Sequence, residues 1–379
     1  MTGVLVEPET DGAAHSTDSI VWIDEADTDS AVAAAGSKIG RLTELHRAGV
    51  SVPQGFAVSV GAYLRHCAAS GLDARVQAVI DGLGGGSSGP GPGPSDAEVE
   101  AASREIRAMF EATPVSEGLR AEIVEAYEEL CLRCVDVNVP TAVRSSATGE
   151  DAADASFAGI FDTYLGVSGP ERVLDAVRAC WGSLFTGRAL AYRLRKGISH
   201  HDMPIAVGVI ELIHARASGV AFSVHPVTGK TDRIVIETSW GWGEAIVQGV
   251  VDPDHVEVGK ADGRILKYNV AHKAVVSAFD FAEGRVTEID MPAKLADRQV
   301  LDEEQIGAVA DAVKCIEDHY GYPVDIEWVI DRHRRPGDPV CIVQSRPVTV
   351  TSEEETPAAY DPVALATKFV FSGKPIPGR

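Results

Sequence analysis

The sequence predicts an α/β protein built of two or three α+β lobes. Segments with the apolar period of a helix are interspersed with short apolar segments typical of strands. The chain has 379 residues, which corresponds to two or three domains of ordinary size, and its 45% hydrophobic and 24% charged residues form a globular composition. A chain of this length buries enough apolar surface to be stable without disulfide bonds.

The charge balance limits the classes of partner. Lys and Arg number 34 against 56 Asp and Glu, so the formal net charge is −22. This excess of negative charge argues against nucleic acid as a partner, and an anionic substrate would need a local concentration of basic groups. No run of about 18 apolar residues is present, so no membrane span is predicted. Residues 1–19 are acidic and polar, unlike a signal peptide, and we expect a flexible leader there.

The six cysteines do not form the pattern of a disulfide framework. Cys131 and Cys134 form a CxxC, but no second CxxC or nearby His cluster completes a zinc site. Both continue the apolar stripe of a helix that Ser116 is expected to open, so we interpret them as packed helix residues. This cysteine usage and the lack of a signal peptide predict a cytoplasmic protein.

The first lobe is expected to begin with a strand and a helix. Residues 20–23 form a short apolar strand, and residues 37–48 have the apolar stripe of a helix that ends at Gly49. Residues 82–94 are rich in Gly, Pro and Ser, which predicts a surface loop or an internal linker.

Strands and glycine-rich connections dominate the rest of the chain. A short strand at 142–145 leads into a loop of small residues at 146–159. The clearest helix is 302–320, where Asp302 and a Gln three residues later resemble a capping box. The remaining predicted elements are a helix at 171–185 and strands at 206–213, 219–224, 234–238, 324–330 and 340–346.

Polar side chains gather on one face of the last two predicted strands. The side-chain period of two puts Asp325 and Glu327 on one face of the first strand, and Gln344 and Arg346 on one face of the second. If the strands pair as a hairpin, two carboxylates, an amide and a guanidinium converge. Carboxylate and amide oxygens suit Mg²⁺, and Arg suits phosphate. A solvated sheet face with cross-strand ion pairs explains the same pattern, so both interpretations stay open on these residues alone.

Two further cations stand where an anion could bind. Arg144 lies in an apolar strand and needs a partner there, either an internal carboxylate or a bound phosphate, because burying an unpaired charge is costly. The small-residue loop after it lets backbone N–H groups approach an anion closely. Lys38 follows Gly36 and Ser37 at a predicted helix N-terminus, which suits phosphate, although an exposed helix lysine has the same pattern.

Six stretches together resemble the N-terminal nucleotide-binding region of the phosphoenolpyruvate synthase and pyruvate phosphate dikinase family. They are GSKIGRLTELHRAGVSVPQGFAVS, VRSSATGEDAADASFAGIFDTYL, SLFTGRALAYR, SGVAFSVHPVTG, GWGEAIVQGVVDPD and DIEW with IVQSRP. They follow the family's order from about residue 36 to 350 and so cover most of the chain. The resemblance implies the ATP-grasp fold, in which two α/β lobes clamp ATP. The implied lobes are 20–205 and 206–350, and the tail at 351–379 resembles the linker to a swivelling histidine domain.

The resemblance also implies which residues hold the phosphates of ATP. Lys38, Arg144 and Arg346 match the family's phosphate-binding residues and are the implied catalytic residues. Gly159 and Thr163 match the loop that closes over the phosphates. All five residues are therefore expected around one triphosphate.

The implied metal and adenine contacts come from two other segments. Glu327 and Gln344 match the family's Mg²⁺ ligands, with Asp325 beside them, so the implied cofactors are ATP and Mg²⁺. Glu211 lies in the segment that holds adenine and is an implied ATP-binding residue. Ile210 stands where the family typically has Gln, so contact with adenine is expected from the backbone there.

The resemblance further implies a partner. In this family ATP phosphorylates a histidine on a separate swivelling domain, which carries a GGxxSHxA-like motif that this sequence lacks. We therefore expect a separate subunit with the phosphohistidine domain, as in the phenylphosphate and alkylphenol phosphate synthases. That reaction would release AMP and phosphate, and a phenol or alkylphenol bound by the partner is a candidate acceptor.

Three alternatives stay open. A self-contained ATP-grasp ligase would activate a carboxylate as an acylphosphate and release ADP. A non-catalytic nucleotide-binding or regulatory subunit is compatible with Ile210, although the intact set of Lys, Arg, Glu, Gln and Arg residues argues against it. An antibiotic phosphotransferase of the rifampin type is a further relative, but it also needs a histidine domain.

Overall fold

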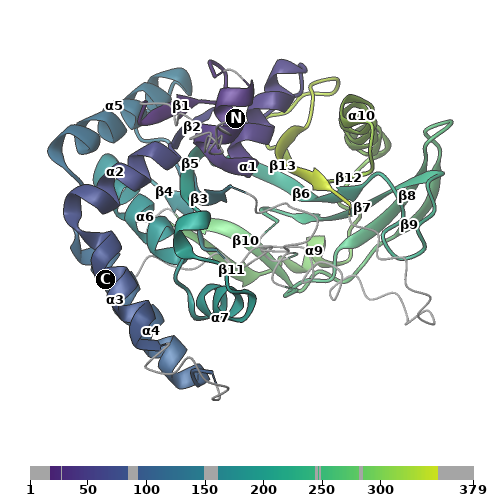
Figure 1. Cartoon of the computed structure of the whole chain (residues 1–379). Coiled ribbons are helices and arrows are strands. Elements are labelled where there is room, and N and C mark those ends of the chain that lie inside the picture. The colour runs from purple at the N-terminus through teal and green to yellow at the C-terminus, as the bar shows by residue number, and fades with distance from the viewer. Residues whose placement is uncertain are drawn as a thin grey trace, which may run out of the picture.

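Two main antiparallel sheets, each covered by helices, carry the fold (Figure 1). The computed structural model describes residues 18–348 except 27, 84–92, 149–160, 244–245, 247–248 and 281–284. Gly159, the tail at 351–379, and most of the leader, of the loop at 82–94 and of the small-residue loop lie outside the described residues.

Five strands form the first sheet, in the order β1-β2-β5-β3-β4, and each adjacent pair is antiparallel. β3 is buried along its whole length because its two faces meet different layers. Val143 and Ala147 pack in the core beneath the helices, whereas Ala142 and Arg144 lie on the opposite face. The strands are β1 (Ile20–Trp22), β2 (Gly55–Val58), β3 (Thr141–Ala147), β4 (Thr163–Val167) and β5 (Ile205–Glu211).

Helices α2 to α7 cover the face of the first sheet that points away from the second sheet (Figure 1). Trp181 is fully buried among them, with its ring 6.0 Å from that of Tyr63. Ser116 caps α5 by accepting from the backbone N–H of Leu119, as its position predicts. The helices are α2 (Val60–Ser70), α3 (Leu72–Leu83), α4 (Asp96–Ala112), α5 (Glu117–Arg133), α6 (Pro170–Ser183) and α7 (Gly187–Lys196), followed by the 3₁₀ turn η1 (His200–Asp202).

Six strands form the second sheet, in the order β13-β12-β6-β7-β8-β9, again with every pair antiparallel. Helix α10 packs its apolar stripe on one face of this sheet, where Ile326 and Trp328 are fully buried. The elements are β6 (Ala215–Phe222), β7 (Arg233–Trp240), β8 (Asp254–Gly259), β9 (Ile265–Asn269), β12 (Val324–Asp331), β13 (Cys341–Pro347) and α10 (Glu303–Tyr320), with the hairpin β10 (Val275–Asp280) and β11 (Arg285–Asp290) and the short helix α9 (Ala293–Ala296) beside them.

Helix α1 (Thr28–Arg47) joins the two sheets. Ile39 and Leu42 pack in a cluster that includes the first sheet, and Leu45 packs in the core of the second. The segment after α1 continues the connection, because the backbone N–H of Ile342 in β13 donates to the carbonyl of Ser51 at 2.8 Å. The helix therefore fixes the distance between the sheets.

The sequence pattern predicts the type of most long elements but not how the strands join. The α/β fold and the capping box at Asp302 are confirmed. The implied lobe boundary at residue 205 stays a prediction, although β5, which it assigns to the second lobe, hydrogen-bonds within the first sheet. Strand β9 is not predicted because its side chains are mostly exposed and form no apolar run.

Cys131 and Cys134 are free cysteines at the end of α5. No described helix is long and apolar enough to span a membrane.

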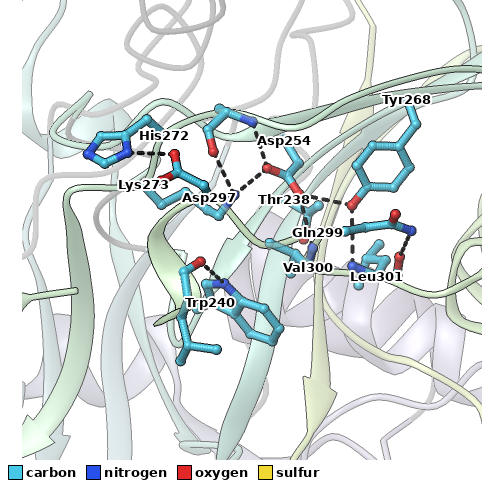
Figure 2. A network of polar contacts seen from close by, with 12 residues as sticks. Thr238, Trp240, Asp254, Tyr268, His272, Lys273, Asp297, Gln299, Val300 and Leu301 are labelled. Carbon is cyan, nitrogen blue, oxygen red and sulfur yellow. Dashed lines mark hydrogen bonds and ion pairs between the residues drawn. The ribbon is translucent and has the colours of Figure 1, made fainter. Parts of the chain in front are cut away.

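A buried ion pair ties β8 and β9 to the segment that follows them (Figure 2). Lys273 and Asp254 are both fully buried, and Nζ of the lysine lies 2.5 Å from Oδ1 of the carboxylate. The same carboxylate accepts from the backbone N–H groups of Ala271 at 2.9 Å and Val300 at 3.0 Å, and from the Tyr268 hydroxyl at 2.9 Å. Both carboxylate oxygens therefore have donors, which compensates the charge inside the protein.

We predict that Lys273→Met destabilises the protein by about 3–5 kcal/mol, because it leaves the Asp254 carboxylate buried without its cation. Lys267→Met is the matched control, since the Lys267 side chain is 47% exposed and lies 3.5 Å from Glu257. Loss of such a surface pair costs about 1 kcal/mol or less. Urea unfolding of both variants measures the difference, and equal losses would contradict a structural role for the buried pair.

Candidate functional site

A pocket of about 810 Å³, including the part that opens to solvent, lies between the two sheets. Strands β3, β4 and β5 line one wall, and β6, β12 and β13 line the other. The segment around Trp242 closes one side of the pocket.

The pocket changes from apolar to polar along the strands. Ala142, Leu165 and Ile210 lie in one row of the first sheet, since Ala142 is opposite both of the others. Two residues further along β3, Arg144 lies opposite Thr163, and both line the pocket. One end can therefore hold an apolar ring and the other an anion.

The start of the regular part of α1 docks on the end of β3. Gly36 interrupts the helix with a φ of 71° and a ψ of 174°, so a new helical segment begins at Ser37. The Ser37 hydroxyl donates to the carbonyl of Ala147 at 3.0 Å, and Ser146 Oγ accepts from the backbone N–H of Ile39 at 3.2 Å. This docking buries Lys38, whose Nζ lies 3.5 Å from the carbonyl of Ser145.

Arg144 crosses from the first sheet to the second. Its Nη1 donates to the carbonyl of Val343 at 3.1 Å, and its Nη2 donates to Oε1 of Gln344. Both acceptors are neutral groups of β13. The side chain is 95% buried, so these contacts fix the guanidinium at the polar end of the pocket.

Strands β12 and β13 pair so that the four polar residues of the hairpin share one face. Asp325 lies opposite Arg346, and Glu327 lies opposite Gln344. Arg346 Nε donates to Asp325 Oδ2 at 2.8 Å, so one cross-strand ion pair is present. Asp325 and Gln344 are each 3% exposed, so this face is buried and is not the solvated sheet face that the pattern also allowed.

Glu327 differs from its neighbours because nothing in the described part of the chain donates to its Oε1, although that atom is buried. Burial raises the pKa of this carboxyl, and the positive charges of Arg144, Arg346 and Lys38 oppose that rise. Thr163 Oγ1 is also buried without a hydrogen bond in the described residues. Both groups line the pocket, so a ligand there could satisfy them.

The donor set suits a hard cation only if the ligand contributes oxygens. The described residues contain no cluster of three His, Cys, Asp or Glu that could hold a metal. Glu327 offers a carboxylate and Gln344 an amide oxygen that also accepts from Arg144 and keeps one lone pair, while Asp325 Oδ2 accepts from Arg346. Mg²⁺ is commonly held by one or two protein carboxylates together with phosphates and water, so these residues fit it.

The segment 210–213 forms the apolar end of the pocket, and most of its backbone groups already make hydrogen bonds within the protein. The N–H groups of Glu211 and Leu212 donate to the carbonyls of Gln54 and Pro140, each at 2.8 Å. The carbonyl of Ile213 accepts from Trp242 Nε1 at 2.8 Å, but its N–H donates to no group in the described residues. Burial raises the pKa of the Glu211 carboxyl. Ile210 places an apolar side chain in the pocket wall.

One row of the second sheet extends the polar face beyond the residues that the sequence pattern singles out. His255 Nδ1 lies 2.8 Å from Glu237 Oε1, and Nε2 lies 3.3 Å from Glu257 Oε1. Burial alone would lower the pKa of His255, but the hydrogen bonds to the two carboxylates outweigh it and raise the pKa. The alternation of side chains along each strand shows which residues share a face. It could have identified this row only if the order of the strands in the sheet had been known. In register order it runs Gln344, Glu327, Val220, Glu237, His255 and Asn269.

Comparisons with known proteins agree on one family. The model described as pyruvate phosphate dikinase, AMP/ATP-binding domain, matches residues 32–366. A probable phosphoenolpyruvate synthase of Methanothermobacter thermautotrophicus is 41% identical over 327 residues, which cover 86% of this chain and 46% of the relative. The phosphoenolpyruvate synthase of Aeropyrum pernix is 36% identical over 367 residues, which cover 90% of this chain and 44% of the relative. The chain thus spans less than half the length of these relatives.

We predict that Gly36→Ala weakens both folding and ligand binding at the pocket. An added Cβ would lie 1.9 Å from the carbonyl oxygen of Ser146, so α1 would have to leave β3 and carry Lys38 with it. Gly49→Ala is the control, because Gly49 has a φ of 82° and open space around its Cβ. The control should lose about 1 kcal/mol from backbone strain alone. Thermal unfolding measures the stability of the two variants. Equal losses of stability would contradict the docking of α1 on β3.

A second prediction concerns pH. Because the pKa of His255 is raised in the folded protein, its stabilisation is complete below about pH 6.5, the unfolded value, and is lost as pH rises through the folded pKa. The free energy of unfolding of the wild type should therefore fall more steeply above pH 6.5 than that of His255→Gln. Chemical denaturation at a series of pH values tests this, and parallel curves would show that the proton on His255 does not contribute.

Proposed function

The chain belongs to the family of pyruvate phosphate dikinase AMP/ATP-binding domains, and we propose that its pocket binds ATP with Mg²⁺ for phosphoryl transfer to a histidine on a partner. The relatives are about twice as long as this chain or longer, so the histidine and the acceptor site are proposed to lie on other domains or on a separate subunit. The overall class is an ATP-dependent phosphotransferase.

The observation that carries the proposal is the gathering of three cations around one carboxylate. Lys38, Arg144 and Arg346 all act on Glu327 electrostatically, and Glu327 Oε1 has no donor in the described residues. Three buried or half-buried cations in a chain with a net charge of −22 suit a polyanion such as triphosphate. Neutralising the triphosphate lowers the repulsion that an incoming nucleophile would meet.

The apolar end of the pocket suits adenine. Ile210, Leu212 and Val329 offer apolar contacts, and the N–H of Ile213, which donates to no group among the described residues, can donate to a ring nitrogen. Since Ile210 cannot hydrogen-bond through its side chain, recognition of the base is assigned to the backbone. Thr163, which lies opposite Arg144, would contact the phosphates at the polar end of the pocket. Gly159 is proposed for the same role from the family motif alone, since it lies outside the described residues.

Glu327 and Gln344 are the residues that would hold Mg²⁺, with Asp325 orienting Arg346 beside them. When bound, the metal would supply charge stabilisation for phosphate oxygens during transfer. Arg144 donates to Gln344 and thereby orients the amide oxygen. The chain's own contribution is to position and neutralise the triphosphate, which is most of what phosphoryl transfer requires.

The proposed nucleophile is an imidazole nitrogen of the partner's histidine. It attacks the β-phosphorus of ATP, the bond to the oxygen that bridges the α- and β-phosphates breaks, and AMP leaves with that oxygen. Water then removes the terminal phosphoryl group as phosphate, so the histidine keeps one. A phenol or alkylphenol bound by the partner remains the proposed acceptor.

Nucleotide chromatography separates this proposal from its rivals. The chain is incubated with ATP and Mg²⁺, with and without a polypeptide that carries the swivelling histidine motif. The proposal expects AMP and phosphate only when the histidine polypeptide is present. ADP formed with a carboxylic acid substrate would instead support a self-contained ligase. Binding of ATP without turnover under every condition would support a regulatory subunit.

We predict that Arg144→Ala and Glu327→Gln each lower AMP formation about a hundredfold or more, because each removes charge at the transferring phosphates. Glu304→Gln is the control, since this carboxylate pairs with Arg334 at 2.9 Å in the second lobe and does not line the pocket. The control should keep the wild-type rate. Circular dichroism checks that each variant is folded, and a folded Glu327→Gln with an unchanged rate would reject the role of that carboxylate.

A further inference from the structure

A second pocket, of about 660 Å³ with its open part included, adjoins the first. Trp242 lines both pockets, so they share this residue. The described residues that line the second pocket include three bases and three aromatic residues, and none of the described lining residues is acidic. These are His214, Arg216, Arg332, Trp240, Trp242 and Phe279.

Arg216 is the group in this pocket that most needs a partner. Its guanidinium lies over the ring of Trp240, 5.5 Å from the centroid. Its Nη1 is buried, and no group in the described part of the chain accepts from it. A buried donor without an acceptor costs free energy, which an anionic ligand would recover. Arg332 stands beside it, on a loop held in place because its backbone N–H donates to the carbonyl of His214 at 2.8 Å.

The aromatic walls are fixed by hydrogen bonds at their edges. Trp240 Nε1 donates to the carbonyl of Leu295 at 3.3 Å, as Figure 2 shows, and Trp242 Nε1 is held by Ile213. Leu295 belongs to α9, which the backbone N–H of Lys273 anchors by donating to Ala296 at 2.9 Å. Both indole N–H groups are therefore used, and the Arg216 guanidinium lies over the Trp240 ring, so Trp242 and Phe279 are the aromatic residues left to contact a ligand.

We propose that this pocket binds a small organic anion with a planar ring. The ring would lie against Trp242 and Phe279, and its carboxylate, sulfonate or phosphate group would accept from Arg216 and Arg332. The site is separate from the proposed nucleotide site and does not depend on it. Three bases and no acid among its described lining residues make this pocket a local exception in a chain with a net charge of −22, and this charge favours an anion over a neutral ring.

Calorimetric titration with three probes tests the two halves of the ligand separately. Benzenesulfonate has both a ring and a charge, sulfate has only the charge, and benzyl alcohol has only the ring. The proposal expects benzenesulfonate to bind the whole chain at least about tenfold more tightly than either of the others. Equal affinity for benzenesulfonate and benzyl alcohol would overturn it, since the bases would then contribute nothing.

Variants locate the bound probe. Arg216→Gln, and independently Arg332→Gln, should weaken benzenesulfonate about tenfold or more, because each removes a charge-assisted donor. Arg335→Gln is the matched control, an exposed arginine of the same loop that does not line the pocket, and should bind as the wild type does. Arg144→Gln, or Arg346→Gln if the former does not fold, should also bind normally. Loss of benzenesulfonate binding in the folded Arg144→Gln or Arg346→Gln variant would place the probe in the nucleotide pocket and reject the proposal.

Discussion

The register between β12 and β13 is the constraint on which the site depends. Glu327 meets Gln344 on the pocket face only because Ile326 and Trp328 occupy the opposite face beneath α10. A slip of one residue would turn the carboxylates into that core and the indole into the pocket. The apolar core of the second lobe therefore sets the chemistry of the pocket, and burying Trp328 is part of placing Glu327.

The site is complete only where the two sheets meet. Lys38 and Arg144 come from the first sheet and its docked helix, whereas Glu327 and Gln344 come from the second. The contact of Arg144 with Gln344 crosses the pocket, so the guanidinium serves both as part of the site and as a link between the lobes. Helix α1 supports the same geometry, because it packs on both cores. The second sheet alone supplies Arg346 beside Glu327, and its meeting with the first sheet adds Lys38 and Arg144.

Strand parity was enough to derive the polar face of the last hairpin, because both strands are adjacent in sequence and their period is simple. Arg144 could be identified as needing a partner, but its acceptors, Val343 and Gln344, lie about 200 residues away and follow from tertiary packing. The row through Glu237 and His255 depends on strand order, which no local pattern encodes. For the same reason the sequence does not show that β5 pairs within the first sheet. Its run of apolar residues is compatible with a position in either sheet.

Trp242 gives the molecule a property that neither pocket has alone. Trp242, whose Nε1 donates to Ile213 and whose ring lies 6.4 Å from that of Phe279, lines two pockets with different electrostatic character. Any tilt of the ring that enlarges one cavity narrows the other, so occupants on its two sides would be thermodynamically linked. Reciprocity then requires that each occupant alter the affinity of the other by an identical factor, whichever arrives first.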